Sequence, residues 1–149
     1  MDIYLAGTIS KDPKHLEWRK YLTETFKNTN HTIVSPMRFQ NPDHFTKDGL
    51  HDKSVPDSFF VATDYSDVAN SDVVFLVYWK EKITQTSAGT RRQSVGTWAE
   101  FGIATFLHVP VIVVTDAPEV LDHPFIRRKA AVVVETVEEG LSYLRKALK

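Results

Sequence analysis

Two carboxylates, Glu100 and Asp64, are the residues of this sequence whose types and positions could do chemistry together. Glu100 follows a Gly-containing stretch, residues 94–97, which predicts that it lies in the first turn of a helix. The amino end of a helix carries roughly half a positive charge, from aligned peptide dipoles and unpaired N–H groups. A carboxylate in that environment stays ionised, so Glu100 is a candidate nucleophile.

The same stretch also fits a simpler structural role. Thr97 and Glu100 have the Thr-x-x-Glu spacing of a capping box. In that motif the glutamate side chain only bonds back to the backbone N–H of the capping residue. Local sequence alone leaves both interpretations of Glu100 open, and the surrounding elements have to decide between them.

Asp64 belongs to a second predicted helix, which Asp57 and Ser58 can cap and which runs to about Asn70. It borders the apolar stripe of that helix, where a carboxylate is costly unless it is paired or hydrogen-bonded. One ionised carboxylate and one that holds a proton form the minimal apparatus for cleaving a glycosidic bond. Glu100 and Asp64 are the pair that the sequence favours for this chemistry.

Two other carboxylates are weaker candidates for the proton-holding role. Asp67 fits the solvated face of the helix that carries Asp64. Asp72 stands at the junction between this helix and the following strand, where a cap or a turn is the default role. Neither position gives a reason to expect an unusual proton affinity, so Asp64 remains the preferred partner of Glu100.

The elements that must position these residues alternate between strands and helices. Strands are predicted at residues 3–6, 31–34, 72–78, 109–114 and 131–135, and helices at 15–27, 57–70, around Glu100 to about residue 107, and at 137–148. This alternation predicts an α/β fold, a doubly wound, flavodoxin-like five-stranded parallel sheet with helices on both faces. Two long loops, residues 37–56 and 79–93, interrupt it, and loops of this length are usually functional.

The predicted strand order, 2-1-3-4-5, places a topological switch between the first and third strands. Ligands of such sheets bind at the carboxyl ends of the strands beside the switch. The residues that follow those two strands are Gly7 to Ser10 and Trp79 to Thr97, with Glu100 directly after them. The predicted fold therefore favours a position of Glu100 in a ligand pocket over a role in capping its helix.

With these residues in place, the chain resembles the nucleoside 2-deoxyribosyltransferase family over most of its length. Four features, in the same order along the chain, carry the resemblance: a first strand with Tyr before small residues, a base-contacting Gln four residues after a Pro, two Asp eight residues apart, and a Gly-x-x-x-Glu-x-Gly-x-Ala signature. The matching residues here are Ile3 to Gly7 with Tyr4, Gln40 after Pro36, Asp64 with Asp72, and Gly96, Glu100, Gly102 and Ala104.

The resemblance implies a mechanism and a set of contacts. Glu100 would attack C1′ of a 2′-deoxyribonucleoside and form a covalent deoxyribosyl enzyme, while Asp64 protonates the departing base and Tyr4 holds Glu100. Gln40 would contact the base, and the substrate-binding set would be Gly7, Thr8, Gln40, Ser94, Gly96 and Thr97. The family needs neither metal nor organic cofactor, and it completes its pocket with residues of a neighbour, which implies a homo-oligomer.

One departure from the family leaves the reaction open. Transferases of this family usually carry an Asp six residues before the nucleophile, where this chain has Ser94. A Ser at that place resembles the related 2′-deoxynucleoside 5′-monophosphate N-hydrolases, and Thr8, Ser10, Arg91 and Arg92 could add phosphate contacts. The sequence therefore favours a transferase that acts on nucleosides and free bases, with the N-glycosidase as its alternative and a non-catalytic nucleotide-binding module as a third reading.

Composition narrows the remaining possibilities. The chain has 149 residues, expected to form a single domain over residues 1–149, a formal net charge of -1 and no cysteine. Near neutrality gives no reason to expect a nucleic acid polymer or a membrane as partner. His44 and His51 share a predicted loop, but their spacing matches no standard zinc motif. The Gly-x-Gly-x-x-Gly fingerprint of dinucleotide-binding proteins and the P-loop motif are both missing from the sequence. We expect a cytoplasmic protein.

Overall fold

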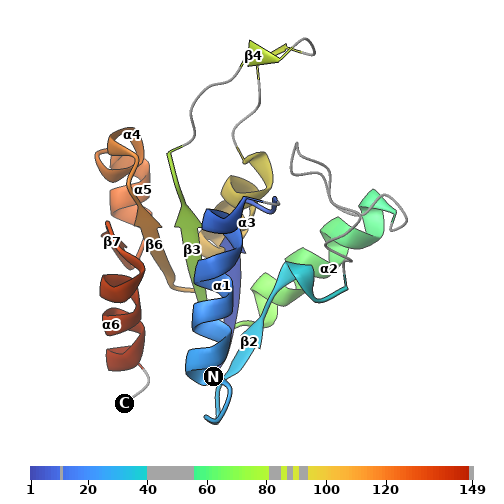
Figure 1. The fold of residues 1–149 in the computed structure, drawn as a ribbon, viewed down its shortest axis with the longest axis vertical. Coiled ribbons are helices and arrows are strands. Elements are labelled where there is room, and N and C mark those ends of the chain that lie inside the picture. The colour runs from blue at the N-terminus through green and yellow to red at the C-terminus, as the bar shows by residue number, and fades with distance from the viewer. Residues whose placement is uncertain (11, 40–55, 81–84, 87–88, 91–93, 148–149) are drawn as a thin grey trace.

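The computed structural model describes residues 1–10, 12–39, 56–80, 85–86, 89–90 and 94–147. Within this part of the chain, a five-stranded sheet forms the centre of the molecule (Figure 1). Five residues that the sequence analysis considered for substrate or metal binding lie outside the described residues: Gln40, His44, His51, Arg91 and Arg92.

The sheet has the order β2-β1-β3-β6-β7, and all its strands are parallel. Its strands are β1 (Asp2–Gly7), β2 (Thr32–Val34), β3 (Val73–Tyr78), β6 (Val111–Thr115) and β7 (Val132–Val134). Both the doubly wound class and the order predicted from the sequence are confirmed. β1 lies between β2 and β3, with Tyr4 opposite Val34 on one side and Val74 on the other.

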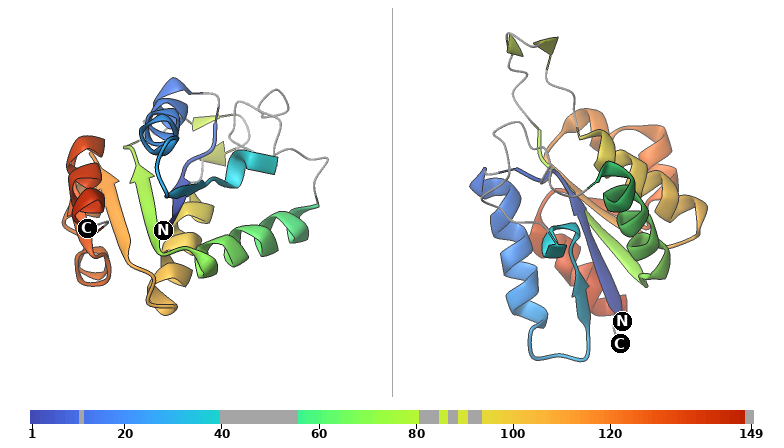
Figure 2. Two further views of the ribbon diagram at one scale, coloured as in Figure 1. Left: turned by 90° about the horizontal axis from the view of Figure 1, so that it is seen from below. Right: turned by 90° about the vertical axis from the view of Figure 1, so that its right-hand side faces the viewer.

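Helices cover both faces of the sheet (Figure 2). One face carries α1 (Pro13–Phe26) and α6 (Val137–Ala147), and the other carries α2 (Asp57–Asn70), α3 (Val95–Phe106), α4 (Pro118–Leu121) and α5 (Pro124–Lys129). This division follows from the alternation of side chains along a strand. In β1, Ile3 and Leu5 face α1 and α6, whereas Tyr4 and Ala6 face α2 and α3.

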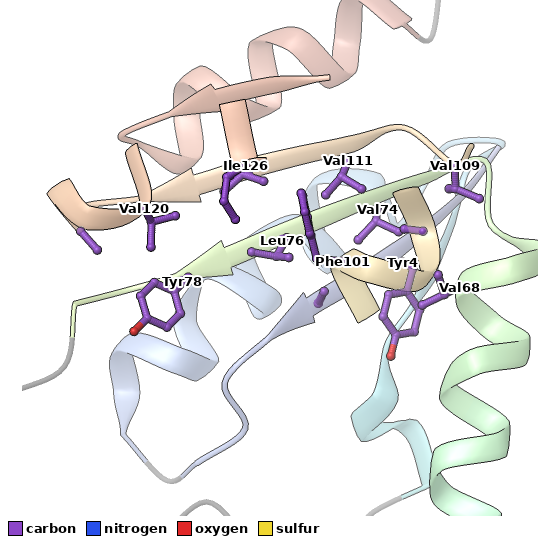
Figure 3. Close-up of a cluster of buried hydrophobic side chains, with 14 residues drawn as sticks. Tyr4, Val68, Val74, Leu76, Tyr78, Phe101, Val109, Val111, Val120 and Ile126 are labelled. Carbon is purple, nitrogen blue, oxygen red and sulfur yellow. The ribbon is translucent and has the colours of Figure 1, made fainter. Parts of the chain in front are cut away.

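The sheet therefore separates two apolar cores. In the core beneath α2 and α3, Tyr4 packs with Val68, Phe101 and the neighbouring strand residues, as Figure 3 shows. The hydroxyl oxygen of Tyr4 points out of this cluster, away from Val74 and Val111. Full burial of one aliphatic or aromatic side chain contributes about 1.5–3 kcal/mol. The ring of Tyr4, which is fully buried, is thus fixed by the core while its hydroxyl is left to make a polar contact.

The structure differs from the predicted elements mainly at helix ends and in short elements. α3 begins at Val95, before Thr97, and α2 is preceded by Pro56 at its cap position, where Asp57 or Ser58 had been expected. A 3₁₀ helix, η1 (Pro36–Phe39), and the antiparallel pair of β4 (Gln85–Thr86) and β5 (Gly89–Thr90) lie inside the two predicted loops. The short helices α4 and α5 were also missed. Elements this short carry too few residues to show a hydrophobic period.

None of the helices within the described residues is long and apolar enough to span a membrane.

Candidate active site

Tyr4 and Glu100 meet directly above the sheet. The Tyr4 hydroxyl donates a hydrogen bond to Glu100 Oε1 over 2.6 Å, and the two residues are 96 positions apart in the sequence. Tyr4 is 0% exposed and Glu100 is 8% exposed, so this bond is screened from water. Asp64, on α2, is 7% exposed and also interacts with the Tyr4 hydroxyl. The two predicted carboxylates therefore come together, joined by the predicted tyrosine.

The fold brings these residues together through three elements. Tyr4 stands in the middle of β1, the strand beside the topological switch. Glu100 lies on the buried side of α3, one turn from Thr97 and Ala104, and Asp64 lies one turn before the buried Val68 on α2. Because α2 and α3 pack against each other over the same face of the sheet, the polar groups on their inner sides converge on Tyr4.

The predicted position of Glu100 in a first helical turn is wrong. α3 begins at Val95, so Glu100 lies in its second turn, too far from the helix end to form a capping box with Thr97. The only described side-chain bond of Glu100 goes to Tyr4 instead. The charge at a helix terminus acts mainly within the first turn, so it does not by itself keep this carboxylate ionised.

Burial dominates the electrostatics of the pair. It raises the pKa of Glu100 to about 8, although the hydrogen bond from Tyr4 acts in the opposite direction. Burial also raises the pKa of Asp64 to about 7, with a further upward contribution from the charge of Asp67. The pKa of the Tyr4 hydroxyl is raised as well, again mainly by burial. At neutral pH this cluster therefore holds at least one proton besides that of the tyrosine.

Tyr4 can stabilise either carboxyl group in its ionised form. A tyrosine hydroxyl has one hydrogen to donate, and Tyr4 donates it to Glu100. Its hydrogen bond also lowers the pKa of Asp64. Because the pKa of Glu100, about 8, exceeds that of Asp64, about 7, Glu100 is the more readily protonated of the two in the absence of substrate. Glycoside cleavage requires the form in which the shared proton lies on Asp64 and Glu100 is ionised.

An ion pair next to Asp64 was missed by the sequence analysis. Arg38 Nη2 lies 2.5 Å from Asp67 Oδ2, which joins η1 to α2. Asp67 is only 16% exposed at its side chain, so its predicted place on a solvated face is wrong. The charge of Asp67 raises the pKa of Asp64 and that of Arg38 lowers it. Asp72, by contrast, is exposed and accepts a 2.7 Å hydrogen bond from the Asp2 N–H, a structural contact with the start of β1.

The candidate substrate-binding residues lie at two chain segments. Gly7 ends β1 and Thr8 follows it, while Ser94 caps α3 and Gly96 and Thr97 lie in its first turn. The hydroxyls of Ser94 and Thr97 are hydrogen-bonded to each other over 2.5 Å. A Cβ added at Gly96 would meet no atom within 4 Å, so the space above this residue is open. No group of three or more potential metal ligands occurs among the described residues.

Arg19 is a further residue that the sequence analysis did not select. It is 5% exposed, and its guanidinium donates to the carbonyl oxygens of Gly7, Thr8 and His15 at 2.9, 3.1 and 2.7 Å. The signal was present in the sequence, because Arg19 falls four residues after His15 and three before Leu22, on the buried stripe of α1. A charged residue on such a stripe calls for polar partners.

These features define an α/β protein with a water-shielded pair of carboxyl groups at the switch point of its sheet. The chain belongs to the nucleoside 2-deoxyribosyltransferase family, whose family model matches residues 3–142. Family membership makes it a glycosyltransferase or an N-glycoside hydrolase.

Solved structures share the fold at low sequence identity. A 2-deoxyribosyltransferase from Bacillus psychrosaccharolyticus is 19% identical, with a TM-score of 0.64, and the match covers 93% of this chain and 89% of the other. A Leishmania mexicana 2-desoxiribosyltransferase is 12% identical, with a TM-score of 0.68 and 97% of both chains covered. A CMP N-glycosidase from Clostridium botulinum is 12% identical, with a TM-score of 0.57 and 99% of both chains covered. No protein of curated function matches this chain in sequence.

The raised pKa of Glu100 predicts a stability effect that depends on pH. Because the folded-state pKa of about 8 exceeds the ordinary value of 4.5, the native state binds more protons than the unfolded state between these values. The free energy of unfolding therefore falls as the pH rises through this window. We expect Glu100→Gln to remove that loss and to raise Tm by roughly a few degrees at pH 8, but not near pH 4.5.

Thermal melts at the two pH values measure this difference. Glu17→Gln, at an exposed position of α1, is the matched control and should show no gain that depends on pH. A Glu100→Gln variant that is less stable than the native protein at pH 8 would contradict a destabilising buried charge at this position.

The two charges beside Asp64 predict opposite shifts of its titration. Asp67→Asn removes a negative charge and releases Arg38 from its partner, so the pKa of Asp64 should fall below about 7. Arg38→Gln removes the positive charge, so that pKa should rise. The ¹³C resonance of the Asp64 carboxyl, assigned by its loss in Asp64→Asn, reports both shifts. A shift of the Asp64 pKa in the same direction in both variants would show that these two charges do not set the proton affinity of Asp64.

Proposed function

We propose that this protein is a nucleoside 2-deoxyribosyltransferase. It cleaves the N-glycosidic bond of 2′-deoxyribonucleosides through a covalent deoxyribosyl-Glu100 intermediate and transfers the sugar to another nucleobase. The observation that supports this most is the 2.6 Å bond by which Tyr4 joins Glu100, within a site that also buries Asp64. Family membership agrees with this chemistry.

In the first half-reaction, a Glu100 carboxylate oxygen attacks C1′ of the substrate. The bond between C1′ and the base nitrogen breaks, its electron pair leaves with the base, and Asp64 supplies the proton that makes the base a neutral leaving group. The transition state resembles an oxocarbenium ion, which the negative charge of Glu100 stabilises as well. The products of this step are free base and an ester of the sugar with Glu100.

The second half-reaction reverses these events with a different base. A nitrogen of the incoming base attacks C1′, Asp64 takes the proton of that nitrogen, and the ester bond breaks to restore the Glu100 carboxylate. Tyr4 holds the orientation of Glu100 throughout, because its ring is fixed in the core and its hydroxyl reaches Oε1. We assign substrate contacts to Gly7, Thr8, Gln40, Ser94, Gly96 and Thr97. The reaction balances without a metal or an organic cofactor.

A second candidate is hydrolysis of a 2′-deoxynucleoside 5′-monophosphate. The Ser94 and Thr97 hydroxyls at the amino end of α3 favour it, because a helix N-terminus with hydroxyl donors suits a phosphate. The structural likeness to a CMP N-glycosidase is compatible with this reading. A non-catalytic nucleotide-binding module is disfavoured, since a binder of anions gains nothing from two buried carboxyl groups.

Two parallel incubations test the proposal. The protein is mixed with a 2′-deoxyribonucleoside and a different free base, and separately with the matching 5′-monophosphate in water, and the products are separated by chromatography. A new nucleoside in the first mixture is the expected result. Free base only in the second mixture would replace the transferase by the N-glycosidase. The absence of turnover in both, by the folded protein, would contradict an enzyme of either kind.

Variants identify the residues responsible for that turnover. Glu100→Ala should lower it by roughly a thousand-fold or more without loss of fold, because the nucleophile is removed. Asp72→Asn, at an exposed carboxylate, is the matched control and should retain it. Mass spectrometry of acid-quenched enzyme should find the sugar on the peptide that contains Glu100. Normal turnover by Glu100→Ala would contradict the assignment of the nucleophile.

We also propose that the protein is a cytoplasmic homo-oligomer. The large apolar side chains of Val95 and Phe106, at the two ends of α3, are 67% and 81% exposed, and a Cβ at Gly102 between them would meet nothing within 4 Å. Apolar surface of this kind is typical of subunit contacts. Light scattering should therefore give a mass that is a multiple of 17.0 kDa, which Phe106→Glu lowers. A monomeric native protein would contradict this proposal.

A further inference from the structure

Ser10 and His15 form a buried polar pair that the proposed mechanism does not use. Ser10 Oγ lies 2.6 Å from His15 Nδ1, and the two residues are 2% and 3% exposed. The Ser10 hydroxyl oxygen also accepts a hydrogen bond of 3.1 Å from the Asp12 N–H. Burying polar groups costs free energy unless they bond to each other, so this contact imposes a geometry that apolar side chains would not.

The start of α1 does not depend on this pair. Asp12 is the N-cap residue, and its side chain accepts a hydrogen bond of 3.0 Å from the Lys14 N–H. The Asp12 carbonyl oxygen accepts a second bond, from the His15 N–H. Two N–H groups of the first turn are therefore satisfied without the imidazole of His15. The bond between Ser10 and His15 instead joins the helix to the loop that precedes it.

That loop begins at the carboxyl end of β1, beside the switch point of the sheet. The carbonyl oxygens of Gly7 and Thr8 accept hydrogen bonds from Arg19, which also donates to the His15 carbonyl oxygen one turn earlier on α1. The loop is thus held from two successive turns of the same helix. Thr8 is partly buried and lies between these two attachments, at Gly7 and at Ser10, so its place is set by α1.

The contacts of Ser10 bear on the phosphate contact that the sequence suggested for it. Its hydroxyl has a single hydrogen, and both His15 and the Asp12 N–H already bond to its oxygen. A side chain that is buried and engaged in this way is suited to holding the loop, and not to a direct contact with a substrate. Thr8 is the loop residue to which we assign that contact.

We propose that His15 is a positioning residue for substrate binding, which acts through Ser10 to fix the loop after β1 and thereby the place of Thr8. The proposal rests on the proposed function for the role of Thr8 as a substrate contact. Loss of a purely structural bond would lower the stability of the protein but leave its affinity for substrate unchanged. Loss of a positioning bond lowers that affinity and leaves the chemical step, which depends on Glu100 and Asp64, intact.

Steady-state kinetics with a 2′-deoxyribonucleoside and a free base separate these two roles. In His15→Ala and in Ser10→Ala we expect KM for the nucleoside to rise roughly ten-fold, the equivalent of one lost hydrogen bond, with kcat within roughly two-fold of the native value. Thr25→Ala is the matched control: it removes a 2.8 Å bond to the Tyr21 carbonyl oxygen further along α1 and should leave KM unchanged. A native KM in folded His15→Ala or Ser10→Ala overturns the proposal.

Two further variants test the bond itself. The double variant of Ser10 and His15 should be no worse than either single one, because all three lack the same contact. His15→Asn carries an amide oxygen and nitrogen near the position of Nδ1, so it can keep the bond to Ser10 and should restore a near-native KM. Additive losses in the double variant, or a KM as high in His15→Asn as in His15→Ala, overturn the role of this bond.

The loop can also be followed without turnover. In ¹⁵N-labelled protein, the backbone order parameters of Thr8 and Ile9 should fall from the roughly 0.85 of a rigid backbone towards 0.6 in His15→Ala, and stay native in His15→Asn. Unchanged order parameters in folded His15→Ala overturn the proposal, whether or not the native protein shows turnover. If His15→Ala does not fold, the same measurement on Ser10→Ala decides. A loosened loop in a protein without turnover would contradict the proposed function alone.

Discussion

The hydrogen bond between Tyr4 and Glu100 is the interaction on which the candidate site depends. It joins the inner strand β1 to α3 in a place from which water is excluded, so neither group can exchange its partner for solvent. A buried bond to a charged group is worth more than one at the surface, and losing it would leave a carboxylate unsatisfied. The register of β1 and the rotation of α3 are both constrained by it, because a shift of one residue in β1 would turn Tyr4 to the opposite core.

Burying the two carboxyl groups costs free energy, which favourable packing elsewhere in the fold must offset. Two carboxyl groups lie against an apolar core whose neighbouring side chains, such as Val68 and Phe101, exclude the water that would solvate them. Their pKa values rise in consequence, which keeps a proton available at neutral pH. The hydrogen bond from Tyr4 moderates that penalty for Glu100. The site is thus tuned by opposing effects, as is usual where proton transfer is required.

Much of the fold could be predicted from the sequence because it depends on patterns that are local. A continuous apolar run identifies β3, and the helical spacing of apolar residues identifies α1 and α6. Once the strands are known to be parallel, the rules for their connections limit the possible strand orders. That Glu100 and Asp64 gather at one site could also be predicted, but their environment could not. The capping-box interpretation made Thr97 the N-cap of α3, three residues after the observed N-cap Ser94, and Glu100 contacts Tyr4 and not the helix end. Arg19 and Arg38 were missed because their partners, backbone carbonyls and Asp67, are defined only by tertiary contacts.

The carboxyl pair does not by itself distinguish transfer from hydrolysis. In the proposed mechanism, once the sugar is bound to Glu100, Asp64 accepts a proton from a base nitrogen or from water with the same atoms. The outcome depends on which acceptor reaches C1′, and hence on groups that bind the second base or exclude water. In the described part of the chain, the segments at Gly7 and at Ser94 are those to which we assign substrate contacts, and neither contains Asp64, Tyr4 or Glu100. Under this proposal, selection between the two reactions acts on these segments, while the catalytic pair can stay the same.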